Sequence, residues 1–329
     1  MRLVPYRLPL VAPLRLAFGT LAHREGALLR LDDGAGRTGW GDVCPLPGFS
    51  PNTLAEALAS LHAWHASGDD SALTPSARAA LDGARLDLDA QAQGAPMAEA
   101  LRPGAASTVA LQALLVGDGP VLLERACAVR TAGYEVAKLK VGALLVDEDV
   151  ARLHAVRAAL GPDVRLRLDA NRAWTFDDAR RFADGACRAE IELVEEPLAD
   201  PARLADIAAH LPVGLDESLR EMAPEDLDGC GFAVAVVLKP VVLGGVRRAL
   251  AWAEAARAAG LDAVVSGAFE SGVGTRHALA LAAALGGGPA GLDPYRMLGA
   301  DVLAPRLALD GPVADVAAAM QSAVVLPGA

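Results

Sequence analysis

The sequence predicts an α/β protein: a modified TIM barrel, (β/α)7β, with an N-terminal α+β capping domain. From about residue 107 onward, short apolar runs alternate with alanine-rich helical stretches. The first hundred residues instead show a few strands followed by helices, which is an α+β pattern. Polar residues also stand at the carboxyl ends of six consecutive predicted strands, where a barrel of this type opens.

Residues 1–103 are predicted to form the capping domain. Residues 26–31 and the stretch around Trp40 have the composition of strands, and Asp32-Asp33-Gly34 between them is typical of a hairpin turn. Two segments with apolar residues at helical spacing follow, at residues 51–66 and 76–93. Strands and helices are therefore segregated in this part of the chain.

Residues 104–294 are predicted to form the barrel. The eight candidate strands are residues 109–115, 136–141, 164–169, 191–195, 213–215, 233–238, 263–266 and a weak one near 291–292. A helical candidate follows each of the first seven, for example at residues 146–160, 176–188 and 246–259. This alternation predicts a TIM-like barrel without its last helix. The final segment, residues 295–329, is expected to pack back on the capping domain.

The composition argues against several classes of partner. The formal net charge is −11 and no cluster of Lys and Arg is present, so a nucleic-acid partner is not expected. No signal peptide and no run of about 18 uncharged apolar residues is found, which predicts a cytoplasmic protein that needs no membrane. Cys44, Cys127, Cys187 and Cys230 are widely separated, so neither a zinc site nor a disulfide framework is indicated. No feature indicates an oligomeric state.

Seven polar residues mark the predicted strand ends: Lys138, Lys140, Asp169, Glu195, Asp216, Lys239 and Ser266. Strand ends of a barrel converge on one mouth, so these side chains are expected to share one pocket. Lys138 and Lys140 lie two apart and should therefore face the same way. Each residue alone has an ordinary explanation, such as a solvated strand face or a helix cap. Six of the seven are charged, and burying these charges together requires mutual compensation or a metal. Arg165 breaks the pattern and is expected at the solvated entry end of its strand.

The carboxylates predict a metal site. Asp169, Glu195 and Asp216 offer three hard oxygen ligands, which suit Mg²⁺, with Mn²⁺ as a possible substitute. An ion held there would stabilise the charge that develops when a proton is removed next to a substrate carboxylate. A lysine can act as the base if cationic neighbours lower its pKa. The expected partner is therefore a small-molecule carboxylate.

Several longer strings carry a resemblance to a known family. They are residues 39–50 (GWGDVCPLPGFS), 167–174 (RLDANRAW), 194–197 (VEEP), 215–218 (LDES), 238–240 (LKP) followed by Gly244-Gly245, and 266–274 (SGAFESGVG). With these strings the chain resembles the enolase superfamily, specifically its muconate-lactonising subgroup, and is most similar to the o-succinylbenzoate synthase family. The resemblance implies that Lys140 is the general base, Lys138 its partner and Lys239 the lysine that faces the base. It assigns Asp169, Glu195 and Asp216 as ligands of Mg²⁺.

The resemblance also implies a reaction. It is the syn-dehydration of 2-succinyl-6-hydroxy-2,4-cyclohexadiene-1-carboxylate to 2-succinylbenzoate in menaquinone biosynthesis. Substrate contacts are expected from Arg167, Ser266 and Gly267, and from a mobile lid that runs from Phe18 to Arg24.

Other functions stay open. An N-acylamino-acid racemase, a dipeptide epimerase or a muconate cycloisomerase of the same superfamily would use the same metal and lysines. Epimerases usually carry Asp-x-Asp near the eighth strand, where this chain has only Asp293. A Schiff-base aldolase also places a lysine in a barrel pocket but does not need three carboxylates. A non-catalytic barrel that serves as a binding module is the last alternative.

Overall fold

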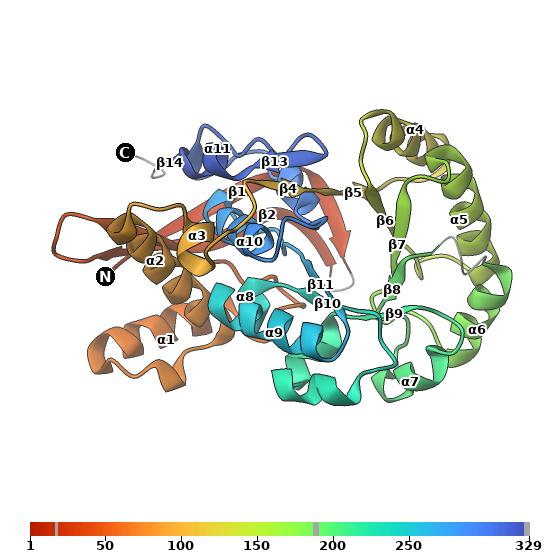
Figure 1. Ribbon diagram of the computed structural model, residues 1–329, viewed down its shortest axis with the longest axis horizontal. Helices are drawn as coiled ribbons and strands as arrows, with labels where there is room; N and C mark the ends of the chain where they lie inside the picture. The colour runs from red at the N-terminus through yellow and green to blue at the C-terminus, as the bar shows by residue number, and fades with distance from the viewer. Residues whose placement is uncertain (17–18, 187–190, 326–329) are drawn as a thin grey trace. The chain divides into compact units, whose positions relative to one another are not determined.

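The computed structural model describes residues 1–16, 19–186 and 191–325, which divide into two compact units (Figure 1). Unit 1 comprises Met1–Val109, Lys239–Ala251 and Val265–Ala329, and unit 2 comprises Ala110–Leu238 and Trp252–Val264. The predicted three-part division of the chain by residue number stays a prediction. No helix in the described ranges is long and apolar enough to cross a bilayer.

An antiparallel sheet of β1 (Arg2–Leu16), β2 (Gly19–Asp32) and β3 (Thr38–Val43) begins unit 1. The predicted hairpin turn is confirmed, since the Asp33 carboxylate accepts hydrogen bonds from the amides of Ala35 and Arg37. The sequence did not predict β1, because prolines at positions 5, 9 and 13 interrupt its strand pattern. They are tolerated because β1 lies at the edge of this sheet and its register shifts between Pro9 and Leu14.

Helices and short strands complete unit 1. Their bounds are α1 (Leu54–Ser67), η1 (Asp70–Ala72), α2 (Pro75–Gln93), α3 (Met97–Leu101), β4 (Thr108–Ala110), α8 (Pro240–Leu243), α10 (Gly272–Ala284), η6 (Asp293–Met297), β12 (Leu303–Ala304), β13 (Val313–Asp315), α11 (Val316–Met320) and β14 (Ala323–Val324). A capping box formed by Thr53 and Glu56 starts α1, three residues later than predicted. In the C-terminal segment β13 pairs with β4, and the Gly299 amide donates to the Pro9 carbonyl at 2.7 Å.

Two glycines allow β3 to lie directly against α2. A Cβ atom on Gly39 would stand 2.1 Å from the Ala84 carbonyl oxygen, and one on Gly41 would stand 1.9 Å from that of Ala80. The neighbouring core is formed by sheet and helix residues such as Leu29 and Leu61. The Gly-Trp-Gly pattern is therefore explained by close packing between a strand and a helix.

We expect Gly41→Ala to destabilise unit 1, because the new methyl group can be accommodated only if β3 or α2 moves. Overpacking of this kind costs roughly 3 kcal/mol. The measurement is the free energy of unfolding in urea. Gly231→Ala is the matched control, since a Cβ there meets no atom within 4 Å. Equal stability of the two variants would contradict the packing argument.

A buried histidine lies in the same region. His277 of α10 faces Gly83 of α2, where an added Cβ would be 2.5 Å from the imidazole ring. Burial, and then the positive charge of Arg276, lower the pKa of His277 to about 3. Arg276 itself pairs with Asp87 at 3.5 Å. His277 is therefore neutral in the folded protein at ordinary pH.

This histidine should make stability depend on pH. The unfolded chain binds a proton at this residue below its ordinary pKa of 6.5, while the folded protein does not until about pH 3. The contribution of His277 to the free energy of unfolding is thus full above pH 6.5. It is lost as the pH falls toward 3, at up to about 1.4 kcal/mol per pH unit. We expect His277→Gln to show a shallower dependence of unfolding free energy on pH in this range. The exposed His62→Gln should keep the wild-type slope.

A parallel sheet forms the centre of unit 2. In the described residues its seven strands follow chain order from β5 to β11, and the pairs from β5 to β10 are parallel. The bounds are β5 (Gln112–Leu115), β6 (Val136–Lys140), β7 (Arg165–Asp169), β8 (Leu193–Glu195), β9 (Val213–Leu215), β10 (Ala235–Leu238) and β11 (Asp262–Val265). The last residue of β11 belongs to unit 1.

Helices connect these strands. They are α4 (Gly119–Thr131), α5 (Val146–Leu160), α6 (Phe176–Gly185), η3 (Pro201–Arg203), α7 (Leu204–Ile207), η4 (Glu217–Glu221), η5 (Pro224–Gly229) and α9 (Val246–Ala258). Figure 1 shows α4, α5, α6 and α7 in a row on one side of the strands. This repeated strand and helix pattern confirms the predicted fold class.

Two predicted strands differ in the structure. The segment at residues 109–115 is divided between β4 and β5 at Leu111. The weak strand predicted near residues 291–292 is reduced to an isolated parallel bridge between Gly291 and Ser266 in the described chain. Glycines at positions 286–288 and prolines at 289 and 294 leave too few consecutive residues with strand preference.

Candidate active site

The strand register of unit 2 places four predicted site residues next to one another. Lys140 at the end of β6 is aligned with Asp169 at the end of β7, and Asp169 is aligned with Glu195 at the end of β8. Asp216 follows β9 directly. The structure therefore brings together the strand-end residues that the sequence singled out in this unit.

Lys138 lies at the centre of the carboxylates. Its buried Nζ donates to Glu195 Oε2 at 2.5 Å and lies 2.9 Å from Asp169 Oδ2. Burial alone would lower the pKa of Lys138, but the charges of Asp169, Glu195 and Asp216 outweigh it, and the pKa lies above its ordinary value. Lys138 is therefore a permanent cation that offsets the negative charge of the cluster.

The donor chemistry of this cluster fits a divalent ion. Three buried carboxylates, each 1–5% exposed, raise the pKa of Lys138 through their charges: Asp169, Glu195 and Asp216. Three hard oxygen donors therefore lie close to one ammonium group. Within the described ranges no three acidic, cysteine or histidine side chains already surround one point at coordination distance.

Lys140 is the accessible lysine of the cluster. Its side chain is 49% exposed, and its Nζ donates to Asn171 Oδ1 at 2.6 Å and to Asp169 Oδ2 at 3.1 Å. Helix α5 holds the adjacent backbone, since Arg152 donates to the Lys140 carbonyl at 2.5 Å. The Asp149 carboxylate accepts from the Gly142 amide at 2.6 Å. The end of β6 is thus fixed while the amine of Lys140 remains open to a ligand.

Glu196 organises a layer of contacts behind the carboxylates. Its fully buried side chain accepts hydrogen bonds from the amides of Asp216, at 2.9 Å, and Ser218, at 2.7 Å. It also accepts from Arg172 Nε at 2.9 Å. Glu196 therefore fixes the backbone at Asp216, a predicted metal ligand.

Sequence reasoning missed the contacts of Asn171, Glu196 and Glu217; in the last of these, Asn171 Nδ2 donates to Glu217 Oε1 at 3.2 Å. All three lie inside the strings that carried the family resemblance, which is the signal that could have drawn attention to them. Strand alternation shows only that Glu196 faces the opposite way from its neighbour Glu195. It does not show that Glu196 is buried and bonded.

Lysine is confined to the predicted site. The chain has 30 basic residues, of which three are lysines and 27 are arginines. Lys138, Lys140 and Lys239 are the three lysines, and all were predicted as site residues. Arginine stays protonated in proteins, whereas lysine can release its proton. The chain thus places its lysine amines only at predicted strand ends.

Lys239 belongs to unit 1. Its largely buried Nζ lies 4.4 Å from the centroid of the Phe49 ring, which is a cation–π contact. Phe49 packs with Leu46 and Val241 in a small apolar cluster. Its expected position facing Lys140 stays a prediction.

Two other predicted contacts of unit 1 lie near the end of β11. The Ser266 hydroxyl donates to the Gly291 carbonyl at 3.3 Å, and the Gly267 amide donates to the same oxygen at 3.0 Å. Both groups thus stabilise the bridge to Gly291. Their contact with substrate stays a prediction.

Arg24 does not lie in an exposed loop as the predicted lid implied, and the lid itself stays a prediction. Arg24 lies within β2, is 1% exposed, and donates to the carbonyls of Cys44, Pro45 and Phe269. A guanidinium has five donors, so a buried arginine can join several backbone segments in this way. Phe18 lies outside the described residues.

The arginines of β7 form their own network. Arg167 is buried, and its guanidinium donates to Glu192 Oε2 at 2.6 Å and to Gln112 Oε1 at 2.9 Å. Its contact with substrate stays a prediction. Arg165 is half exposed and pairs with Glu192 and Glu135 at the start of the strand. The expectation of a solvated entry end is confirmed.

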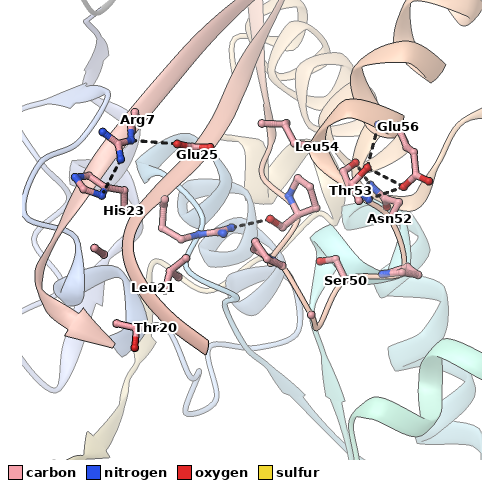
Figure 2. A pocket seen from close by; sticks show the side chains of 16 residues that line it. Arg7, Thr20, Leu21, His23, Glu25, Ser50, Asn52, Thr53, Leu54 and Glu56 are labelled. Carbon is pink, nitrogen blue, oxygen red and sulfur yellow. Dashed lines mark hydrogen bonds and ion pairs between the residues drawn. The ribbon is translucent and has the colours of Figure 1, made fainter. Parts of the chain in front are cut away.

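Unit 1 also contains a hollow of about 620 Å³. Figure 2 shows Arg7, His23 and Glu25 on one side of it and Asn52, Thr53 and Glu56 on the other. This volume lies in the range of pockets that bind small molecules. Several of its polar residues bond to one another, since Arg7 donates to Glu25 and the Glu56 carboxylate accepts from the Thr53 amide at the start of α1.

Comparison with known proteins identifies relatives over most of the chain. Residues 121–318 match the family model "Enolase C-terminal domain-like", and residues 1–88 match "MenC, N-terminal domain". The o-succinylbenzoate synthase of Thermobifida fusca (strain YX) is 36% identical over 88% of this chain and 80% of the relative. That of Klebsiella pneumoniae (strain 342) is 34% identical over 91% and 89%.

A solved structure shows the same fold. The dipeptide epimerase from Enterococcus faecalis V583, complexed with Mg and the dipeptide L-Leu-L-Tyr, superposes with a TM-score of 0.86. It is 27% identical and covers 99% of this chain and 97% of its own. The chain is thus similar over nearly its whole length both to relatives named as synthases and to an epimerase.

Proposed function

We propose that this chain, which belongs to the enolase superfamily, is an o-succinylbenzoate synthase. Membership of this superfamily makes it an enzyme, and the specific reaction is the proposal. The substrate would be 2-succinyl-6-hydroxy-2,4-cyclohexadiene-1-carboxylate and the product 2-succinylbenzoate, a step of menaquinone biosynthesis. A small-molecule carboxylate as partner and a cytoplasmic location stay predictions of the sequence.

The proposal depends chiefly on one observation in the structure. An accessible lysine, Lys140, lies beside a buried cluster in which Lys138 is held by strand-end carboxylates. We propose that Asp169, Glu195 and Asp216 hold Mg²⁺, with Mn²⁺ as a possible substitute. When bound, the ion supplies electrostatic stabilisation of the charge that develops on the substrate carboxylate.

Lys140 would perform both proton transfers. Its neutral amine takes the proton from the carbon next to the substrate carboxylate, and the resulting ammonium gives a proton to the hydroxyl that leaves on the same face. One C–H and one C–O bond break, water departs, and the ring becomes aromatic. Lys138 remains protonated throughout and balances the carboxylates. Lys239, held over Phe49, is proposed to supply a second cation near the reacting ring.

The names of the relatives favour dehydration over the other reactions of the superfamily. Relatives named o-succinylbenzoate synthase are 34–36% identical, whereas the epimerase structure is 27% identical. Among residues 291–296 the chain has one acidic residue, Asp293, and its carboxylate accepts from Arg296 at 3.1 Å. The two acidic residues expected of a dipeptide epimerase are therefore not both present. Dipeptide epimerisation is the second candidate, because a dipeptide epimerase superposes on 99% of this chain with a TM-score of 0.86.

A spectrophotometric assay tests the proposal. The purified protein is mixed with the cyclohexadiene carboxylate, and the loss of diene absorbance is followed with Mg²⁺, with Mn²⁺ and with a chelator. We expect rapid loss with either ion and none with the chelator. If the diene persists with metal-loaded folded protein, the synthase assignment is wrong. Hydrogen exchange in D₂O at the α-carbon of dipeptides and N-acylamino acids would then identify an epimerase or racemase.

A Schiff-base mechanism is tested separately. Borohydride added during turnover should not attach substrate to any lysine, because the proposed chemistry forms no imine. A borohydride-trapped adduct would support the aldolase alternative.

A further inference from the structure

We propose that Asn171 is a positioning residue for Lys140 and that Glu217 sets the direction of the Asn171 side-chain amide. This inference rests on the proposed role of Lys140 as the base. Lys140 ends β6, Asn171 lies in the turn after β7 and Glu217 begins η4, and all three belong to unit 2.

A chain of hydrogen bonds joins the three residues. Lys140 Nζ donates to Asn171 Oδ1 at 2.6 Å, a shorter contact than the 3.1 Å to Asp169 Oδ2. Asn171 Nδ2 donates in turn to Glu217 Oε1 at 3.2 Å. Glu217 is itself buried, with 6% exposure, so solvent does not readily replace this contact. The half-exposed amine of Lys140 is thus connected to a buried carboxylate through one amide.

The chemistry of the three groups fixes the direction of the amide. An ionised carboxylate only accepts hydrogen bonds and an ammonium only donates them, while an amide has one end of each kind. With Nδ2 toward Glu217, the carbonyl oxygen faces Lys140. Rotation of the amide by 180° would place its NH₂ group against the ammonium and its oxygen against the carboxylate. Both contacts would then be repulsive, so Glu217 selects the orientation that holds the lysine.

The backbone under Asn171 is also fixed. Asn171 has a φ of +44° and Arg172 a φ of +59°, a conformation that asparagine tolerates better than most residues. The backbone N–H of Asn171 donates to Asp169 Oδ1 at 3.1 Å, and the backbone N–H of Arg172 donates to the Glu196 carbonyl at 2.7 Å. The turn therefore presents the side chain of Asn171 from a defined position.

The contact with Asn171 gives the amine of Lys140 a defined position. The amide oxygen accepts from Lys140 Nζ at 2.6 Å. Lysine has a flexible four-carbon stem, and Lys140 is half exposed, so without such a contact its amine would sample several positions. Misplacement by about 1 Å can cost on the order of 100-fold in rate.

The test uses the accessibility of Lys140 as well as turnover. Asn171→Gly removes the amide and tolerates the positive φ, and Glu217→Gln removes the charge that directs the amide. Each variant is treated with a small amine-acylating reagent, and the acylation rate of each lysine is followed by peptide mass spectrometry. The chain has only three lysines, and the buried Lys138 serves as an internal reference. Asn52→Gly makes the same change far along the chain, where the side chain bonds Thr53 and Ser76.

We expect Asn171→Gly to raise the acylation rate of Lys140 by roughly three- to tenfold and to lower kcat by about 10- to 100-fold, with little change in KM. Glu217→Gln should show the same changes to a smaller extent, because a glutamine oxygen can still accept from Nδ2. Asn52→Gly should leave the labelling of Lys140 unchanged.

Unchanged labelling of Lys140 in Asn171→Gly would overturn the proposal. A raised KM with unchanged labelling would also overturn it, because Asn171 would then contact the substrate directly. If the wild-type protein does not dehydrate the diene, the proposed function fails, while the labelling rates still decide whether Asn171 holds Lys140.

Discussion

Lys140→Ala should abolish dehydration and leave the fold intact. Lys140 is proposed both to remove the α-proton and to protonate the leaving hydroxyl, so its loss removes both transfers. General acid–base groups typically contribute 10²–10⁴-fold, and we expect a fall in kcat of roughly 10⁴-fold. The side chain is 49% exposed, so the free energy of unfolding should change by less than about 1 kcal/mol. The diene assay and urea unfolding measure the two effects.

Lys140→Arg is the informative control. Arginine keeps the positive charge beside Asp169 but cannot release its proton near neutral pH. If Lys140 acts as a base, this variant should be nearly as inactive as Lys140→Ala. If Lys140 acts only as a cation, Lys140→Arg should retain a large share of the wild-type rate. Retention of more than about a tenth of kcat would therefore contradict the proposed role.

Glu195→Gln should lower both metal affinity and stability. The substitution keeps the shape of the side chain but removes one of the three charges proposed to hold the ion. It also removes a charged partner of Lys138, whose Nζ lies 2.5 Å from Glu195 Oε2. Loss of one partner of a buried ion pair costs roughly 3 kcal/mol. We expect turnover to fall by at least about 100-fold and the Mg²⁺ concentration for half-maximal rate to rise.

Two measurements separate these effects. Thermal unfolding with and without Mg²⁺ should show that the ion stabilises the wild-type protein and much less the variant. Glu225→Gln makes the same change at an exposed residue and should behave as the wild type in both experiments. A Glu195→Gln protein with normal activity and a normal response to Mg²⁺ would contradict the assignment of Glu195 as a ligand.

The sequence by itself determined the repeated elements and the ends of the barrel strands. Helix α5 was predicted with its observed bounds, and β9 likewise, because the apolar spacing that defines such elements involves neighbours in the chain. Lys140, Asp169 and Glu195 could be placed together without knowledge of their contacts, because parallel strands in sequential order bring their carboxyl ends to one edge.

Only the tertiary structure decided which side chains bond to one another. The burial of Arg24 among three carbonyls, the hydrogen bonds of Glu196 to the Asp216 segment, and the line from Lys140 through Asn171 to Glu217 all join residues far apart in the chain. Local spacing gives the face on which a residue lies. Its partner depends on strand register, on burial and on the donors and acceptors within reach, and these are fixed only when the strands pack together.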